Sequence, residues 1–250
     1  GFDGRGGHGR RERGGRFVEL PPIVALIDGL AELRTVNLTE RFIDIGAALT
    51  LTEMLELKEG TFPMALTETL RGIATPSIRN LATIGGNLAT RRRFMDAWAV
   101  LACLEALVEL RDGAGSRWMN INRLIDAGAN PSFPAGSLMT RVRMPIDTWT
   151  VSVVRKTGNK HWPALNSGIF VLLAKIDKGI VASFRMVWAG EKALRFPELE
   201  KRLLGKRLPL ERRERSSLRD EYLEAASVVA PELAKGFCVL VEAALDHISR

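Results

Sequence analysis

The stretch that decides the fold is Ile73-Ala74-Thr75-Pro76-Ser77-Ile78-Arg79-Asn80-Leu81-Ala82-Thr83-Ile84-Gly85-Gly86-Asn87-Leu88-Ala89. Its central part, from Thr83 to Asn87, joins a hydroxyl, two residues without a β-carbon and an amide. Adjacent glycines let the backbone turn tightly and approach a bulky ligand, and their N–H groups suit anionic oxygens. The residues alone therefore allow two interpretations, a cradle for a nucleotide phosphate or an ordinary Gly-Gly turn between two strands.

The flanks of this stretch resemble a family signature. Ala74-Thr75-Pro76 precedes the segment from Ile78 to Leu88, and Asp96 follows in an apolar segment. This order is similar to Ala-Ser-Pro-x-Ile-Arg-Asn-x-Ala-Thr-Ile-Gly-Gly-Asn-Ile, the signature of the FAD-binding (medium) subunit of molybdenum hydroxylases. That family includes the flavin domain of xanthine dehydrogenase and the medium subunit of carbon monoxide dehydrogenase. A preceding strand, the Ile-Gly-Ala at 45–47 and two helices extend the resemblance upstream to about Pro22.

The resemblance implies a set of residues that hold FAD. Thr83 and the N–H groups that follow it would bind the diphosphate, and Asp96 would bind a ribose or ribityl hydroxyl. The family has a leucine against the flavin near the start of a later strand, a role that falls to Leu138 or Met139. The cofactor residues predicted in this way are Thr83, Ile84, Gly85, Gly86, Asn87, Asp96, Leu138 and Lys156.

Several of these residues have a second interpretation that needs no ligand. A carboxylate such as Asp96 is favourable at the start of any helix, because the helix dipole is positive there, and this is compatible with a cofactor contact. Leu138 could be a core leucine. Lys156 lies in an Arg-Lys segment that resembles the family, and it could approach the flavin. Arg79 is expected to make structural hydrogen bonds more readily than a ligand contact.

The sequence departs from the family pattern in two places. Residues 90–95 read Thr-Arg-Arg-Arg-Phe-Met where Asn-Ala-Ser-Pro-Ala-Ala is usual, and the arginines are expected to face solvent more readily than to add charge near the diphosphate. The first phosphate loop of the family, Ala-Gly-Gly-Thr-Asp, is missing from residues 1–15. That segment is rich in Gly and Arg, which favours a disordered tail. The resemblance therefore implies weakened binding of FAD.

Composition limits the class of protein. The chain has 250 residues, 46% of them apolar, enough for a sizeable core and two domains. The formal charge of +7 comes from separate basic runs with few aromatic residues, which argues against nucleic acid as a partner. Cys103 and Cys238 lie in apolar helical patterns and are expected to be reduced, buried thiols of a cytoplasmic protein. No segment is long and apolar enough to predict a membrane span, and the three scattered histidines predict no metal site.

The predicted fold class is α+β. Residues 16–146 form an FAD-binding domain of the xanthine dehydrogenase/vanillyl-alcohol-oxidase type, and residues 147–250 form a smaller domain of sheet and helices. Thr50 is predicted to cap a helix through Leu57, with Glu53 as its capping-box partner. The other predicted helices cover 64–73, 96–110, 194–204, 218–229 and 231–248, with a helical turn at 124–127. The predicted strands cover 21–27, 42–47, 137–145, 151–156, 165–176 and 180–189, with a hairpin turn at 112–113.

By resemblance, the chain is an oxidoreductase subunit that passes electrons through FAD. Its partners would be a molybdenum-cofactor large subunit and a [2Fe-2S] small subunit, with NAD or another molecule as electron acceptor. No side chain is predicted to be catalytic, because the flavin carries the redox chemistry. Two alternatives stay open: a structural subunit that has lost FAD, and a basic nucleic-acid-binding module.

Overall fold

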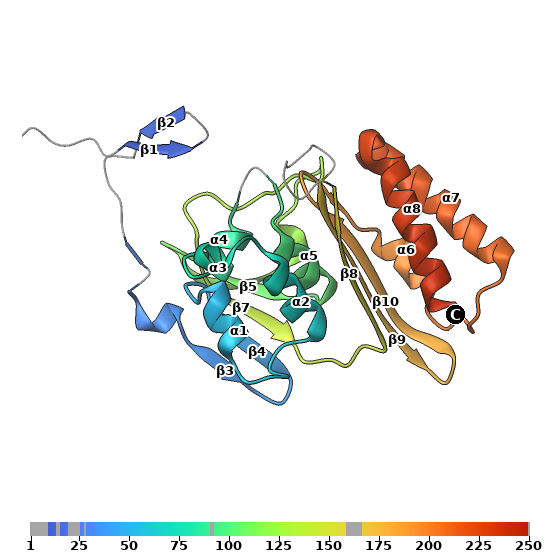
Figure 1. Cartoon of the computed structure of the whole chain (residues 1–250), viewed down its shortest axis with the longest axis horizontal. Coiled ribbons are helices and arrows are strands. Elements are labelled where there is room, and N and C mark those ends of the chain that lie inside the picture. The colour runs from blue at the N-terminus through green and yellow to red at the C-terminus, as the bar shows by residue number, and fades with distance from the viewer. Residues whose placement is uncertain are drawn as a thin grey trace, which may run out of the picture.

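The computed structural model describes residues 10–13, 16–19, 26, 27, 29–90, 93–158 and 167–249. Within these residues the strands form three antiparallel sheets. The smallest is a hairpin of β1 (Arg10–Arg13) and β2 (Arg16–Glu19). The other two sheets carry the fold, and they stand on either side of one buried helix (Figure 1).

The first large sheet has five strands in the order β3-β4-β7-β5-β6. Its inner face is apolar and includes Ile43, Ile45 and Val142, which are at most 1% exposed. The helices of the first half of the chain lie over this face (Figure 1). The strands are β3 (Val36–Leu38), β4 (Phe42–Gly46), β5 (Leu107–Asp112), β6 (Gly115–Asn120) and β7 (Leu138–Pro145). The helices are η1 (Ala31–Leu33), α1 (Leu51–Glu56), α2 (Met64–Gly72), α3 (Pro76–Arg79), α4 (Ile84–Leu88) and α5 (Asp96–Cys103).

The second large sheet has four strands in the order β11-β10-β9-β8. Helices cover both of its faces, so β9 begins with seven consecutive buried residues. In Figure 1 the sheet stands between α5 on one side and α7 and α8 on the other. The strands are β8 (Val151–Thr157), β9 (Gly168–Asp177), β10 (Ile180–Ala189) and β11 (Ala193–Leu194). The helices are α6 (Pro197–Lys201), α7 (Arg212–Val229) and α8 (Pro231–Ile248).

Helix α5 lies between the two large sheets. Its residues after Asp96 are all buried. One continuous apolar core surrounds it, with Ile43 and Val142 from the five-stranded sheet and Val171 and Val187 from the four-stranded sheet. The predicted boundary at 146/147 falls between the end of β7 and the start of β8. The two halves of the chain therefore share a core through α5.

The predicted capping box and most of the predicted strands are confirmed. The N–H of Glu53 donates to Oγ1 of Thr50 at 3.2 Å, and the N–H of Thr50 donates to Oε2 of Glu53 at 2.8 Å. The strands at 42–47, 137–145, 151–156 and 180–189 match β4, β7, β8 and β10 within two residues. The turn at Asp112 joins β5 to β6 as a hairpin. Cys103 and Cys238 are free and buried, as predicted.

The predicted helix at 96–110 is wrong in its second half. Helix α5 ends at Cys103, Glu105 takes a left-handed φ of 57°, and Leu107 begins β5. A continuous apolar run cannot be divided between helix and strand by periodicity alone, and pairing with β7 decides it here. The helical turn expected at 124–127 is instead the 3-10 helix η2 (Ile121–Arg123). The helix expected from Leu194 begins later, at Pro197, the first helical position that proline favours.

Two predictions at the N-terminus fall largely outside the described residues. Of the tail predicted over 1–15, Arg10–Arg13 is described, and it forms β1 of the hairpin rather than an unstructured segment. A two-stranded hairpin satisfies its backbone through cross-strand hydrogen bonds without a core, which composition alone did not reveal. Of the strand predicted at 21–27, the last two residues are described; they are not in a strand, and Leu26 is 85% exposed. The arginines at 91 and 92 also lie outside the described part.

A buried carboxylate on the five-stranded sheet gives the fold a pH dependence. Glu109 is 8% exposed and accepts hydrogen bonds from Arg141 Nε at 2.7 Å, Thr140 Oγ1 at 2.6 Å and Ser116 Oγ at 2.7 Å. The hydrogen bond from Arg141, aided by those from Thr140 and Ser116, lowers the pKa of Glu109 from 4.5 to about 2. The folded pKa lies below the unfolded one, so the ionised carboxylate stabilises the fold above about pH 4.5 and this contribution disappears as the pH falls toward 2.

We therefore expect Glu109→Gln to lower the free energy of unfolding by about 2 kcal/mol at pH 7. The difference from the wild type should shrink steadily below pH 4.5. Urea unfolding followed by circular dichroism at pH 7, 4 and 3 measures both quantities. The exposed Glu56 provides the control Glu56→Gln, which should change stability little at any of these pH values. An unchanged difference between pH 7 and pH 3 would contradict the assignment.

Candidate functional site

The glycine stretch begins a helix that is anchored beside the start of α1. Oγ1 of Thr83 caps α4 by accepting the N–H of Gly86 at 3.0 Å. The N–H of Ile84 donates to the carbonyl of Leu49 at 3.0 Å, and a bridge joins Thr83 to Thr50. The stretch is therefore not a turn between two strands, because it leads directly into α4.

The four N–H groups predicted to bind a phosphate are already engaged. Besides Ile84 and Gly86, the N–H of Gly85 donates to the carbonyl of Ala47 at 2.9 Å, and that of Asn87 donates to the carbonyl of Thr83 at 2.9 Å. A capped helix start satisfies its own first donors. That these N–H groups bind the diphosphate stays a prediction: an anion at this place would have to share the N–H of Gly86, the only exposed residue of the four.

The two glycines of this helix have different roles. A β-carbon on Gly85 would lie 2.7 Å from Cβ of Ala47 and 2.8 Å from its carbonyl oxygen, so Gly85 allows close packing of the backbone. A β-carbon on Gly86 would meet only Oγ1 of Thr83, at 3.1 Å. Gly85 is thus required by the fold, whereas Gly86 leaves open space on the exposed side of the helix.

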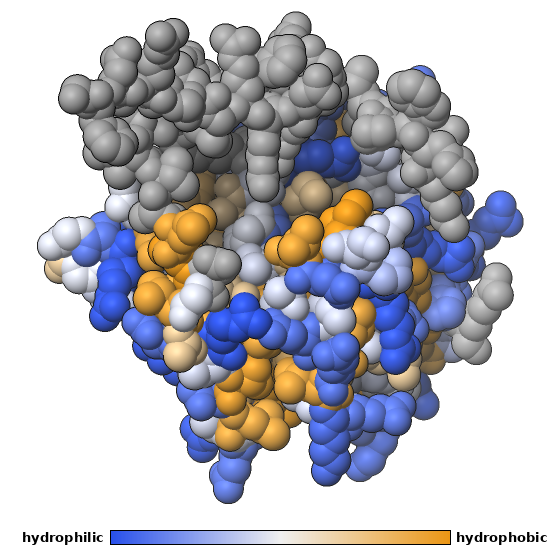
Figure 2. Space-filling view, turned by 60° about the vertical axis from the view of Figure 1, so that its left-hand side comes forward, coloured by the Kyte–Doolittle hydropathy of each residue, from blue (hydrophilic) through white to orange (hydrophobic). Residues whose placement is uncertain are grey.

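A pocket of about 310 Å³ opens beside these glycines. It is lined by Thr83, Gly85 and Gly86 together with Leu138 at the start of β7. Leu138 is 39% exposed, whereas Met139, which also lines the pocket, is 4% exposed and belongs to the core. The other lining residues are apolar except for Ser137, and they are Ile27, Leu33, Ala47, Ala48, Ala89, Phe133 and Ser137. Figure 2 shows hydrophobic surface among the charged residues on the face that lies to the left in Figure 1.

Asp96 and Lys156 contact each other and do not line this pocket. Nζ of Lys156 lies 2.7 Å from Oδ2 of Asp96 and donates to the carbonyl of Gly72 at 2.7 Å. Asp96 is the first residue of α5, so the helix dipole favours its charge, as the structural interpretation expected. The pair links the start of α5 and the end of α2 to the edge strand β8.

Arg79 has the structural role that was expected of it. Its Nη1 donates to the carbonyls of Ile73 at 2.8 Å, Ala74 at 3.1 Å and Arg71 at 3.3 Å. These carbonyls lie in the last turn of α2 and just after it, where cations are favourable. Ala74 has a left-handed φ of 46°, and the arginine holds this turn in place.

Ile84 and Asn87 point inward. Ile84 is 0% exposed and lies in the core, and Asn87 is 8% exposed. Among the residues that the structure describes, Oδ1 of Asn87 has no hydrogen-bond partner. Sequence reasoning assigned no role in the pocket to Ala47 and Ala48. The sequence signal for these two residues was the Gly-Ala-Ala run at the end of β4. A β-carbon on Gly46, the first residue of this run, would lie 2.2 Å from the carbonyl oxygen of Leu33, so the backbone packs closely here.

The pocket fits part of an FAD molecule. Ligand pockets usually measure about 300–1,000 Å³, and 310 Å³ is at the small end for a dinucleotide. Its apolar wall at Leu138 suits a flat ring, and the hydroxyl of Thr83 with the open side of Gly86 suits a polar group. The donors for a diphosphate are few among the described residues. In that part of the chain no group of three or more His, Cys, Asp or Glu could hold a metal, and no helix has the length and apolarity to cross a membrane.

Residues 6–147 match the family model described as the FAD binding domain in molybdopterin dehydrogenase. The nicotinate dehydrogenase FAD-subunit of Eubacterium barkeri is 30% identical over 204 residues, which are 77% of this chain and 68% of that protein. The glyceraldehyde dehydrogenase medium chain of Sulfolobus acidocaldarius is 26% identical, over 76% of this chain and 69% of that protein. The crystal structure of the Cu,Mo-CO dehydrogenase has the same fold, with a TM-score of 0.69 at 20% identity over 88% of this chain and 78% of that chain.

Proposed function

This chain belongs to the family of FAD-binding domains of molybdopterin dehydrogenases, and on that premise we propose that it passes electrons between an iron–sulfur partner and NAD or another acceptor. It is an FAD-binding oxidoreductase subunit of the molybdenum hydroxylase type, with FAD as its cofactor. The observation that carries the proposal is the pocket that joins Thr83, Gly86 and Leu138 inside the family match.

FAD supplies the redox chemistry when it is bound, and this chain binds and orients it. Leu138 would cover one face of the ring system, and its apolar neighbours would exclude water from that face. Thr83 and the N–H of Gly86 would bind the diphosphate. Asp96 would hold a sugar or ribityl hydroxyl, and Lys156 would lie near the flavin. For this, the ion pair between Asp96 and Lys156 would break and each residue would contact the cofactor instead.

The proposed partners are a molybdenum-cofactor large subunit and a [2Fe-2S] small subunit. Relatives are named as an FAD-subunit, a medium chain and a subunit beta, which supports an assembly of several chains. Two free, buried thiols support a reducing, cytoplasmic location.

A charge on the pocket wall tests the cofactor site. We expect Leu138→Glu to weaken FAD binding at least tenfold, because it places a carboxylate against the ring and near the diphosphate. Leu138 is 39% exposed, so the fold should survive. The control is Leu38→Glu on β3, where the leucine is 63% exposed. Flavin fluorescence during titration of FAD into the full chain gives the affinity, and equal affinity of both variants and the wild type would contradict the site.

The same preparation separates the proposed function from its alternatives. A yellow protein with flavin absorbance supports the FAD subunit. A folded, colourless chain that takes up no FAD supports a structural subunit. Retention on DNA that falls steeply with salt supports a nucleic-acid-binding module. Co-purification with a molybdenum subunit and an iron–sulfur subunit tests the assembly directly.

A further inference from the structure

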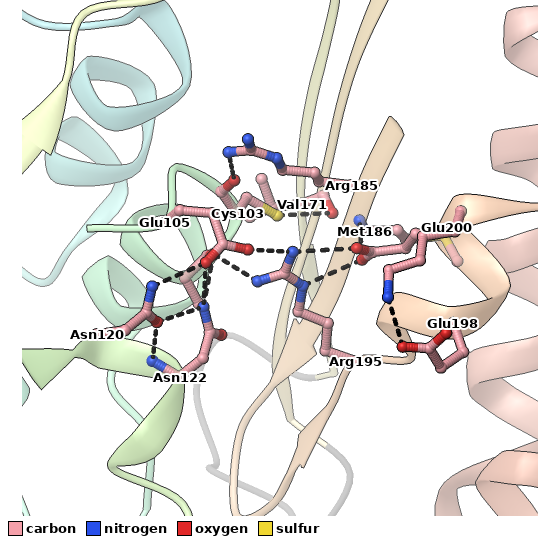
Figure 3. Close-up of polar contacts among 12 residues, drawn as sticks. Cys103, Glu105, Asn120, Asn122, Val171, Arg185, Met186, Arg195, Glu198 and Glu200 are labelled. Atoms are coloured by element: carbon pink, nitrogen blue, oxygen red, sulfur yellow. Dashed lines mark hydrogen bonds and ion pairs between the residues drawn. The ribbon is translucent and has the colours of Figure 1, made fainter. Parts of the chain in front are cut away.

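The far end of α5 is held by a buried ion network. Arg195, which follows β11, has a side chain that is 8% exposed. Its Nε and Nη2 donate to Oε1 and Oε2 of Glu200 at 3.1 and 3.0 Å, and Nη2 lies 2.5 Å from Oε1 of Glu105 (Figure 3). Oε1 of Glu200 also accepts the N–H of Met186 at 2.9 Å. The network joins β10, β11 and α6 to the segment that follows α5.

Two arginines, Arg185 in β10 and Arg195 just after β11, bind the last carbonyls of α5. Nη1 of Arg195 donates to the carbonyl of Ala102 at 2.9 Å, and Nη1 of Arg185 donates to that of Cys103 at 2.8 Å (Figure 3). These carbonyls are the negative end of the helix dipole, so both contacts are charge-assisted. The side-chain amide of Asn122 is a second side-chain donor to the carbonyl of Ala102, at 3.2 Å. The position of this helix end along its axis is therefore fixed by Arg185 and Arg195 from the second half of the chain and by Asn122 from the first.

The near end of the same helix carries Asp96. Asp96 contacts Lys156, which reaches the end of α2 through the carbonyl of Gly72. Between the two ends α5 is fully buried, and close-packed interiors transmit displacements instead of absorbing them. A shift of the helix at Ala102 would thus move Asp96 by a similar amount.

We propose that Arg195 is a positioning residue for the FAD site, acting through α5 on the Asp96–Lys156 pair. The proposal rests on the proposed function, in which these two residues meet the cofactor. Arg195 lies at the opposite end of the helix and touches no pocket residue: α5 places Ala102, its partner, about 9 Å along the axis from Asp96. A structural ion network would alter stability alone, whereas a positioning residue also alters cofactor affinity in the folded protein.

A double-mutant cycle on FAD affinity tests this. Arg195→Lys keeps the charge but loses the paired contacts with Glu200, and Lys156→Met removes the pair at the other end. We expect each single variant to weaken FAD binding about tenfold. Independent effects would multiply to about a hundredfold in the double variant, whereas we expect a loss of about ten- to twentyfold. Sites this far apart usually act independently, so this shortfall is the signature of coupling through α5. Affinities are compared at temperatures where circular dichroism shows every variant fully folded.

The matched control is Arg202→Lys, the same substitution at an exposed pair with Glu221, which should leave FAD affinity unchanged. Wild-type affinity in Arg195→Lys, or strictly multiplicative losses in the cycle, would overturn the proposal. If Arg195→Lys does not fold, Glu200→Gln loosens the same contact while keeping the acceptor for Met186, and the same cycle applies. A wild-type chain that takes up no FAD would reject the proposed function and, with it, this inference, because Arg195 would then have no cofactor site to position.

Discussion

Gly85→Ala is expected to lower the free energy of unfolding by about 1–3 kcal/mol, whereas Gly86→Ala should leave it within about 0.5 kcal/mol of the wild type. The two residues are adjacent in one helix, so propensity favours alanine equally at both. They differ in their neighbours. The new methyl group at Gly85 would overlap Ala47, whose backbone cannot retreat because its carbonyl accepts the N–H of Gly85. The methyl group at Gly86 would meet only Oγ1 of Thr83.

The affinity for FAD should depend mainly on Gly86. A methyl group at Gly86 occupies the open side of the helix, where the N–H and the hydroxyl of Thr83 would meet the diphosphate, so we expect at least a tenfold loss of affinity. Urea unfolding and FAD titration measure the two effects separately. Gly236→Ala in α8, another helical glycine with nothing within 4 Å, controls for helix propensity and should be neutral or slightly stabilising. A larger loss of stability at Gly86 than at Gly85 would contradict the roles assigned to them.

The sequence predicted local features of this site better than its contacts. The capping box at Thr50 and the strand that begins at Leu138 depend on residues close in the chain, and the structure confirms both. The acceptors of two of the predicted phosphate donors could not be predicted. The N–H groups of Ile84 and Gly85 donate to the carbonyls of Leu49 and Ala47, more than thirty positions earlier in the chain, and no local pattern encodes these contacts.

The errors in secondary structure have the same cause. The run from Ala97 to Leu110 is apolar except for Glu105 and Glu109, so it carries no period that separates α5 from β5. Pairing of β5 with β7 ends the helix. Arg185 and Arg195, which lie far along the chain, stabilise this end by donating to its last carbonyls. Asp96 and Lys156 were each predicted as cofactor residues from separate segments. Their mutual ion pair became visible only when β8 was placed beside α2 and α5.

Glu200→Ala is expected to lower the free energy of unfolding by about 3–5 kcal/mol, the largest effect of any single substitution considered. Glu200 is 5% exposed, and its removal leaves the buried guanidinium of Arg195 with Glu105 as its one carboxylate partner among the described residues. It also leaves the N–H of Met186 without its acceptor. The exposed pair of Arg202 and Glu221 gives the comparison, because Arg202→Ala should cost no more than about 1 kcal/mol. The double variant Arg195→Met with Glu200→Leu should lose less than Glu200→Ala alone, since no buried charge is then left uncompensated. Urea unfolding monitored by circular dichroism gives all three values, and a double variant less stable than Glu200→Ala would show that the network stabilises the fold through its contacts rather than by balancing buried charge.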